Sequence, residues 1–297
     1  MKSEEMDIPI SKIEELKSVT EENGAHFLYC AAPSKEVYET VPCNMENHDK
    51  ENYHNYLSRL SDKEIPFLDF SEVLRKEGIK DEDIFFYTDH HWKPYCGFVS
   101  ANAICEELKN RYGFEYDKEI ADFNNYSTKE YKDWFLGSYG KKVGTYFTWQ
   151  GADDFELITP KFETSMIEEQ PIKDETREGS FEETALYTEN LEKDYYKYNT
   201  YATYCGGDFR LQIIKNNMKQ DGKKVIIIRD SFACVVAPFL SLQTKELHIC
   251  DMRDMEGLIG DKINIRDYIE EVKPDYVIVL YTRFGDSKDE DHRFDFF

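Results

Sequence analysis

The run Val225-Ile226-Ile227-Ile228, four consecutive β-branched residues, constrains the fold more than any other feature of the sequence. β-branched side chains favour extended backbone, and a short, continuous apolar run is typical of a fully buried strand. Arg229-Asp230-Ser231 follow directly, and residues 232–240 are expected to form a helix. A buried strand that leads into a helix is the repeating unit of α/β proteins, so we expect an α/β fold.

The same alternation of helix and strand patterns continues on both sides of an aromatic middle segment. Residues 114–205 carry alternating aromatic and polar residues with frequent glycines, which predicts β-hairpins, and the acidic stretch 165–195 is expected to be mostly loop. We therefore predict one domain, 1–297, with a central parallel sheet of about five strands and a β-rich insertion at about 114–205. The pattern predicts helices over 10–23, 48–62, 71–78, 94–110, 208–220, 232–240 and 264–272, and strands over 25–32, 65–70, 84–87, 225–228, 247–250 and 276–281.

Charge and cysteine content exclude several classes of protein. The net charge of −23, without a basic cluster, argues against binding to nucleic acid and to anionic membranes and disfavours a polyanionic substrate. The seven cysteines form no CxxC pair and several lie in apolar runs, which favours reduced thiols over a disulfide framework. No apolar run is long enough for a transmembrane helix, and Met1–Glu5 lacks a signal-peptide core. We expect either a cytoplasmic protein or a chain that begins behind an anchor.

Ser231 lies where a catalytic nucleophile is expected in an α/β fold. It follows a buried strand and begins a helix, at the carboxyl edge where such sheets bind ligands. Backbone N–H groups at a helix start can stabilise a developing oxyanion. On this segment alone, the alternative that Ser231 only caps the helix remains open.

A serine hydroxyl needs a neighbouring base, normally a histidine oriented by a carboxylate. Asp89, His90 and His91 lie together on a loop that leaves a predicted strand, and Asp89 and His91 are close enough to hydrogen-bond within one turn. A metal site at these residues is disfavoured because three consecutive residues rarely converge on one ion, and we expect neither a metal nor a cofactor. A polar loop without a catalytic role is the remaining alternative.

Several motifs, in this order, resemble the DHHW and AlgX/AlgJ-like branch of the SGNH hydrolase superfamily. They are Thr88-Asp89-His90-His91-Trp92, the segment Phe135–Gly140, Arg229-Asp230-Ser231-Phe232 and Asp251-Met252-Arg253. The resemblance spans residues 25–285 and implies an SGNH-hydrolase-like three-layer α/β/α fold. It also implies that Ser231 is the nucleophile, His91 its base and Asp89 the orienting carboxylate, with His90 as the variable position between them.

The oxyanion donors are less determined, because the next two strand ends lack the glycine and asparagine usual in SGNH hydrolases. The backbone N–H of Ser231 or Phe232 is the first expectation, assisted by Arg253 or Arg283. Arg283 could equally pair with Asp230 in a structural role.

The resemblance implies an O-acetyltransferase or acetylesterase that acts on a cell-surface or exported polysaccharide through an acetyl-serine intermediate. It also implies a location outside the cytoplasm or on a membrane anchor, and an acyl donor supplied by a membrane acyltransferase. The net charge suits a neutral glycan better than a polyuronate. A carbohydrate-binding or assembly protein without turnover is the alternative from another class. The sequence leaves the oligomeric state and the choice between transfer and hydrolysis open.

Overall fold

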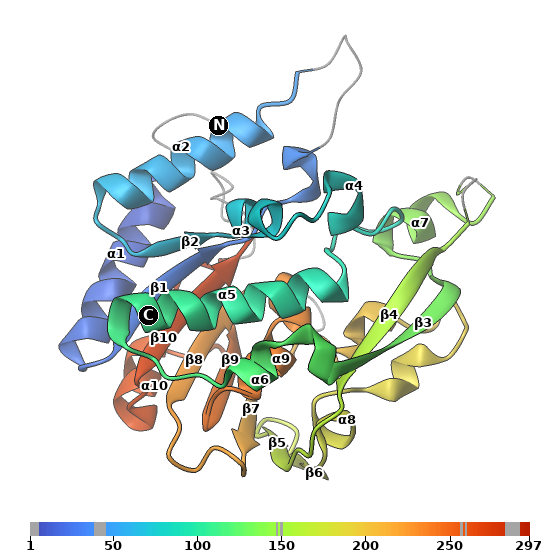
Figure 1. Ribbon diagram of the computed structural model, residues 1–297. Coiled ribbons are helices and arrows are strands. Elements are labelled where there is room, and N and C mark those ends of the chain that lie inside the picture. Colours follow the sequence, from blue (N-terminus) through green and yellow to red (C-terminus); the bar gives the residue numbers. More distant parts are fainter. Residues whose placement is uncertain are drawn as a thin grey trace.

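The fold is built around one mixed sheet of eight strands, in the order β2-β1-β10-β8-β9-β7-β5-β6 (Figure 1). The computed structural model describes residues 6–38, 46–146, 148, 151–255, 258, 260–282 and 292–297. The five strands from β2 to β9 run parallel, and β7, β5 and β6 extend the sheet in antiparallel pairings. The predicted parallel core of about five strands is therefore present.

The elements have the following bounds. The strands are β1 (His26–Ala31), β2 (Phe67–Asp69), β3 (Tyr126–Phe135), β4 (Asp153–Pro160), β5 (Met166–Gln170), β6 (Glu175–Gly179), β7 (Leu211–Asn216), β8 (Lys224–Arg229), β9 (Glu246–Asp251) and β10 (Tyr276–Tyr281). The α-helices are α1 (Asp7–Glu22), α2 (Asp49–Asp62), α3 (Phe70–Lys76), α4 (Asp81–Ile84), α5 (Pro94–Tyr112), α6 (Lys118–Ala121), α7 (Ser138–Val143), α8 (Phe181–Thr184), α9 (Ala237–Ser241) and α10 (Ile265–Val272). Short 3-10 helices include η5 (Thr200–Thr203) and η6 (Ser231–Val235).

Each central strand contributes to two hydrophobic cores, one on each face of the sheet. Along β8, Val225 and Ile227 belong to one core, and Ile226 and Ile228 to the other. The helices α3, α5 and α9 supply residues to the first core, whereas α1, α2 and α10 supply the second. The arrangement of helix, sheet and helix confirms the predicted three-layer α/β fold.

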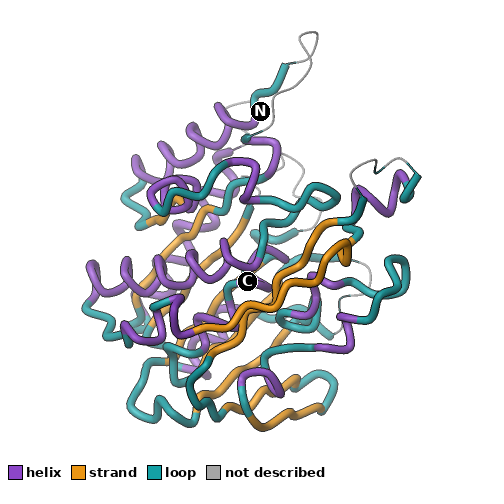
Figure 2. The backbone as a smooth tube through the Cα atoms, turned by 45° about the vertical axis from the view of Figure 1, so that its right-hand side comes forward, coloured by secondary structure: helices purple, strands orange, loops and turns teal. Residues whose placement is uncertain are grey.

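The segment between 114 and 205 is only partly as predicted. Strands β3 and β4 form a separate antiparallel pair (Figure 2). The expectation that 165–195 is mostly loop was wrong, because β5 and β6 form a hairpin there that joins the main sheet. Glu168 and Gln170 point into the protein from β5 beside Met166, so two of its three inward positions are polar and the usual apolar alternation is hidden.

The predicted helix over 208–220 was also wrong, since this region forms strand β7 beside β9. Gln212, Ile214 and Asn216 are its buried positions. Gln212 donates a hydrogen bond to Glu168, and Asn216 donates to the carbonyls of Ser241 and Leu242. Two of the three inward residues are therefore polar, which removes the two-residue hydrophobic period that identifies a strand.

Smaller corrections concern the ends of elements. Residues 84–87 contain the end of α4 and an isolated bridge between Phe85 and Trp92 rather than a strand. The cap of α3 is Asp69, whose carboxylate accepts from the N–H of Ser71. The region 232–240 is divided into η6 and α9, with Pro238 near the start of α9.

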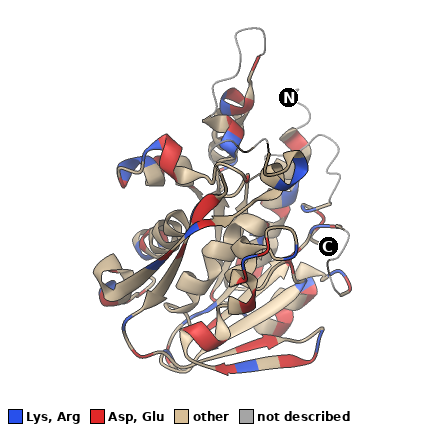
Figure 3. Ribbon diagram, turned by 90° about the vertical axis from the view of Figure 1, so that its right-hand side faces the viewer, with Lys and Arg blue, Asp and Glu red and all other residues tan. Residues whose placement is uncertain are grey.

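Acidic residues, in red, are spread over many elements with basic residues, in blue, between them (Figure 3). Among the described helices, none combines the length and apolar character needed to span a membrane.

Candidate active site

Ser231 begins η6 directly after the carboxyl end of β8, a central parallel strand of the sheet. The cap of η6 is Asp230, whose carboxylate accepts a hydrogen bond from the N–H of Phe232 at 3.0 Å. The alternative that Ser231 serves as the helix cap is therefore wrong. Its hydroxyl instead faces His91, which comes from a distant part of the chain.

His91 links Ser231 and Asp89 through its two ring nitrogens. Nε2 lies 2.7 Å from Oγ of Ser231, and Nδ1 lies 2.5 Å from Oδ1 of Asp89. Both contacts lie within or close to the range expected for a nucleophile, a base and a carboxylate that orients the base. Asp89 is 3% exposed and His91 is 8% exposed, so water has little access to the pair. With Nδ1–H donated to Asp89, the imidazole presents Nε2 as an acceptor for the serine proton.

The carboxylate of Asp89 is held by hydrogen bonds from two segments. Oδ1 accepts from the backbone N–H of His91 at 2.9 Å, and Oδ2 accepts from the N–H of Ser138 at 2.5 Å. Burial alone would raise the pKa of Asp89, but the hydrogen bond and charge of His91, with the charge of His90, hold it well below its ordinary value. Asp89 is therefore ionised at neutral pH and can stabilise a positively charged His91.

Asp153 fixes the backbone of the loop that carries Asp89. Its carboxylate accepts from the backbone N–H groups of Tyr87 and Thr88, at 2.6 and 2.7 Å, and from the hydroxyl of Thr88 at 2.5 Å. The same hydroxyl of Thr88 accepts from the N–H of Gly137 at 2.9 Å. Strand β4 and the start of α7 therefore set the position of this loop.

Two rings pack closely against His91. Tyr201, in η5, stacks on it with ring centroids 4.1 Å apart, and the ring of His90 lies 3.8 Å away on centroids. Tyr201 is 2% exposed and its hydroxyl donates to the carbonyl of Ser231 at 3.2 Å. The stack restricts the orientation of the imidazole and joins it to the serine turn.

His90 lies beside the triad rather than within it. Its Nδ1 is 3.0 Å from the hydroxyl of Ser138, and its side chain is 39% exposed. Burial, together with the charge of His91, lowers the pKa of His90 to about 4, although Asp89 acts in the opposite direction. His90 is therefore neutral at physiological pH.

Phe232 was expected to donate its backbone N–H to an oxyanion, and the structure contradicts this expectation. That N–H is already donated to Asp230, the helix cap. Its carbonyl accepts from Nε1 of Trp92 at 2.9 Å, which joins the histidine loop to the serine turn. No described residue accepts a hydrogen bond from the N–H of Ser231, so this N–H is the remaining backbone candidate for an oxyanion donor.

Arg253 belongs to an ion-pair network at the same edge of the sheet. Its guanidinium contacts the carboxylates of Asp251 and Asp208, at 2.5 and 2.8 Å. Arg229 also pairs with Asp208 at 2.8 Å. These contacts give Arg253 a structural role, and its assistance to an oxyanion stays a prediction.

Arg283 lies outside the described residues, so its expected contributions stay predictions. Asp230 pairs with Arg293 at 3.2 Å and accepts from the N–H and hydroxyl of Thr282. Burial raises the pKa of Asp230, but the charges of Arg293 and Arg253 and the bonds from Thr282 hold it below its ordinary value.

Asp89, His90 and His91 bring potential metal-ligand atoms within 4.8 Å of one another. Both ring nitrogens of His91 already contact Asp89 and Ser231, and Nδ1 of His90 contacts Ser138. A metal ion would have to displace these hydrogen bonds, whereas a serine–histidine–aspartate triad uses them. The geometry fits acyl transfer better than metal binding.

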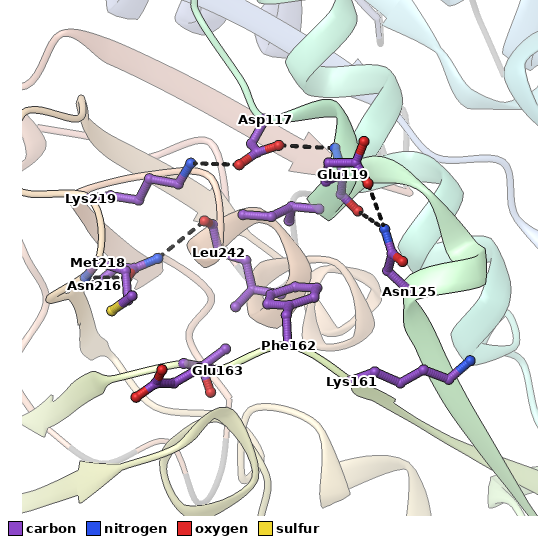
Figure 4. Close-up of a pocket in the computed structure, with 12 residues that line it drawn as sticks. Asp117, Glu119, Asn125, Lys161, Phe162, Glu163, Asn216, Met218, Lys219 and Leu242 are labelled. Atoms are coloured by element: carbon purple, nitrogen blue, oxygen red, sulfur yellow. Dashed lines mark hydrogen bonds and ion pairs between the residues drawn. The ribbon is translucent and has the colours of Figure 1, made fainter.

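A cavity of about 460 Å³ lies away from this site (Figure 4). Asn216, at the end of β7, lines it next to the amino end of β9, so the cavity lies at the edge of the sheet opposite Ser231. Its polar side chains mostly contact one another or the backbone, as for Lys219 with Asp117 and Asn125 with Glu119. We assign no function to it.

Sequence reasoning missed the parts that Tyr201 and Asp153 play in the site. Each comes from the segment between 114 and 205, where the sequence gives no local sign of contact with the histidine loop. Gly137 and Ser138 fall within the motif Phe135–Gly140, so the resemblance marked the segment but not its hydrogen bond to Asp89.

Comparison with known proteins supports the resemblance. Residues 6–133 match the family model described as the SGNH hydrolase-like domain of acetyltransferase AlgX. This match includes Asp89 and His91 but ends before Ser231. No curated protein matches the chain.

Solved structures with this fold cover nearly the whole chain. Bacillus cereus PatB1, solved with a sulfonyl adduct, has a TM-score of 0.76 and 21% identity, covering 99% of this chain and 93% of PatB1. A DHHW family protein from Eubacterium siraeum has a TM-score of 0.69 and 17% identity, covering 96% of this chain and 88% of that protein. The O-acetyltransferase domain of Pseudomonas putida AlgJ has a TM-score of 0.54 and 10% identity, covering 94% and 82%.

The matching family model is that of an acetyltransferase, and it covers residues 6–133, less than half of the chain. The structural neighbours, at 10–21% identity, support the fold. The resemblance predicted from the sequence is therefore confirmed: the chain has an SGNH hydrolase-like fold, and its first part, residues 6–133, matches the AlgX acetyltransferase family.

Proposed function

We propose that the protein is a serine-dependent O-acetyltransferase or acetylesterase that acts on a neutral polysaccharide through an acetyl-serine intermediate. The observation that carries the proposal is the continuous contact from Ser231 Oγ to His91 Nε2, and from His91 Nδ1 to Asp89 Oδ1. Three residues from two separate segments meet in the geometry that nucleophilic catalysis requires.

In the first half-reaction, Oγ of Ser231 attacks the acetyl carbonyl of the donor while Nε2 of His91 takes the hydroxyl proton. Asp89 stabilises the imidazolium that forms. The backbone N–H of Ser231 is the described donor available for the oxyanion. Collapse of the tetrahedral intermediate breaks the bond to the leaving alcohol, which receives the proton from His91, and leaves acetyl-serine.

In the second half-reaction, a hydroxyl group attacks the acetyl-serine and gives its proton to His91. A sugar hydroxyl yields an acetylated glycan, and water yields acetate. The proton then returns to Ser231 as the ester bond to the enzyme breaks. Both outcomes use the same residues, so the acceptor that enters the site determines which reaction occurs.

The test is steady-state release of acetate from a chromogenic acetyl ester by wild type and Ser231→Ala. We expect Ser231→Ala to lower kcat by several orders of magnitude with an unchanged fold, because removal of the hydroxyl deletes covalent catalysis. A sulfonyl fluoride should inactivate the wild type by forming a sulfonate ester at Oγ of Ser231 with release of fluoride, in keeping with the sulfonyl adduct in the PatB1 structure.

Unchanged hydrolysis by Ser231→Ala would contradict the proposal. If well-folded wild type were inactive on several acetyl donors, the alternative of a carbohydrate-binding or assembly protein without turnover would be favoured instead.

A further inference from the structure

We infer that exposed tyrosines on and beside α7 form an acceptor-binding platform for the pyranose rings of a neutral glycan. This inference rests on the proposed function and names the surface that would deliver the acceptor to Ser231. The platform consists of Tyr139, Tyr146 and Tyr196.

Exposed aromatic side chains are concentrated in this one place. Among the described residues, four large aromatic side chains are clearly exposed: Tyr87 at 50%, Tyr139 at 36%, Tyr146 at 90% and Tyr196 at 62%. All four lie in α7 or in the segments that adjoin it. A surface that gathers exposed apolar rings is typical of a binding site rather than of random exposure.

The segments that carry these tyrosines contact one another. Nζ of Lys141, in α7, donates to the carbonyl of Tyr198 at 3.0 Å, which holds the segment with Tyr196 against the helix. The hydroxyl of Tyr196 lies beside Gly144, 4.0 Å from where a Cβ would stand. Tyr146 follows two residues later, and α7 projects from the body of the protein at the end of the β3–β4 pair (Figure 1).

The platform leads directly to the candidate active site. Helix α7 begins at Ser138, which contacts both Asp89 and His90. The ring of Tyr139 lies 5.9 Å from that of His90 on centroids, and His90 lies 3.8 Å from His91. At about 1.5 Å per residue, the six residues of α7 span roughly 9 Å, so the helix extends this surface from Ser138, beside the triad, toward the segment that carries Tyr146.

Tyrosine suits a glycan because its ring packs against the C–H face of a sugar while its hydroxyl bonds to sugar hydroxyls. It also loses little conformational entropy on binding. Charges of both signs surround the platform: Tyr139 donates to Glu36 beside Lys35, and the charge of Lys141 interacts with those of Asp89 and Asp194. With a chain charge of −23, this favours a neutral glycan over a polyuronate.

The test measures binding without turnover, in the Ser231→Ala background. Native gel electrophoresis is run with hydroxyethyl cellulose or galactomannan as neutral probes and alginate as the anionic probe. We expect at least one neutral polymer to retard the protein. The double variant Tyr146→Ala/Tyr196→Ala should weaken this binding about tenfold, since two stacking contacts are lost.

Tyr116→Ala is the control, because Tyr116 is a half-buried tyrosine beyond the end of α5 that lines a pocket with Gly222 and Lys223, before the start of β8 and so at the edge of the sheet opposite Ser231. In the Ser231→Ala background, we expect the protein with Tyr116→Ala to be retarded as much as Ser231→Ala alone. Thermal melts check that the double variant stays folded. We expect that it does, because both replaced side chains are largely exposed.

Retardation by neither neutral polymer, retardation by alginate alone, or equal retardation of the double variant would each overturn the platform. Binding of a protein partner that depends on these tyrosines, without glycan binding, would overturn it as well. The acetylation of Ser231 is measured separately, so failure of the proposed function is distinguishable from failure of the platform.

Discussion

Replacement of Gly137 by alanine should disable the site without unfolding the protein. A Cβ at this position would stand 2.2 Å from Cβ of Asp89 and 2.5 Å from its Oδ2. Carbon atoms in contact are ordinarily separated by about 3.5–4.0 Å, so the carboxylate must move by roughly 1 Å or more. The backbone of Gly137, with φ −76°, is open to alanine, so the effect comes from the collision alone.

The size of the expected loss of activity follows from the contacts that Asp89 makes. Its displacement would break the hydrogen bond from Ser138 and turn His91 away from Ser231. A misplacement of about 1 Å costs about 100-fold in rate, and overpacking costs about 1–3 kcal/mol of stability. We therefore expect kcat/KM for an acetyl ester to fall about 100-fold or more, with a cooperative thermal transition at a modestly lower temperature.

Gly113→Ala is the matched control. Gly113 ends α5 with φ 75°, and nothing lies within 4 Å of its added Cβ, so the variant should lose about 1 kcal/mol from backbone strain and keep full activity. If Gly137→Ala retained wild-type kcat/KM, the structural reasoning about Asp89 would be refuted.

Three further predictions concern neighbouring residues. Asp89→Asn should lower kcat by about 10³–10⁴-fold with an unchanged fold, because the amide favours the wrong tautomer of His91, and a loss below tenfold in steady-state kinetics would contradict this. The pKa of His90 is about 4 in the folded protein, below its ordinary value of 6.5. Folding therefore favours the neutral imidazole, and the protein loses stability as the pH falls below about 6.5 because the unfolded chain then binds more protons. His90→Gln should therefore lose less Tm than wild type between pH 7 and pH 5, and identical slopes in thermal melts would count against the assignment. Asp230→Ala should destabilise the protein by about 3 kcal/mol in urea unfolding, because it removes a buried acceptor from Phe232, Thr282 and Arg293, and a change below about 1 kcal/mol would show that these bonds matter little.

The parallel core was predictable because most of its strands are short, continuous apolar runs between helices with regular periodicity. The strands at the antiparallel side were not, since β5 and β7 turn Glu168 and Gln212 inward, where Gln212 donates a hydrogen bond to Glu168. From the sequence alone, two polar residues that pair with each other inside the protein look the same as two polar residues exposed to solvent. These strands are recognised only by their pairing with strands that are distant in the sequence, which a local pattern does not reveal.

The three central residues of the site were predictable for a different reason. Ser231 follows the clearest strand, and Asp89 and His91 adjoin one another, so local sequence positions each partner. The contacts that orient them come from Tyr201, Asp153 and Ser138, which reach the site through tertiary folding alone. The expected oxyanion donor Phe232 was wrong because the capping role of Asp230 was not recognised.

The most direct test of the account is to trap the acetyl-enzyme. Wild type and Ser231→Ala are exposed briefly to a chromogenic acetyl ester, quenched in acid, digested and examined by mass spectrometry. The account predicts one added acetyl group on the wild-type peptide that contains Ser231, and none on that peptide in the variant. Acetyl label confined to lysine or cysteine residues, or equal label in both proteins, would contradict it.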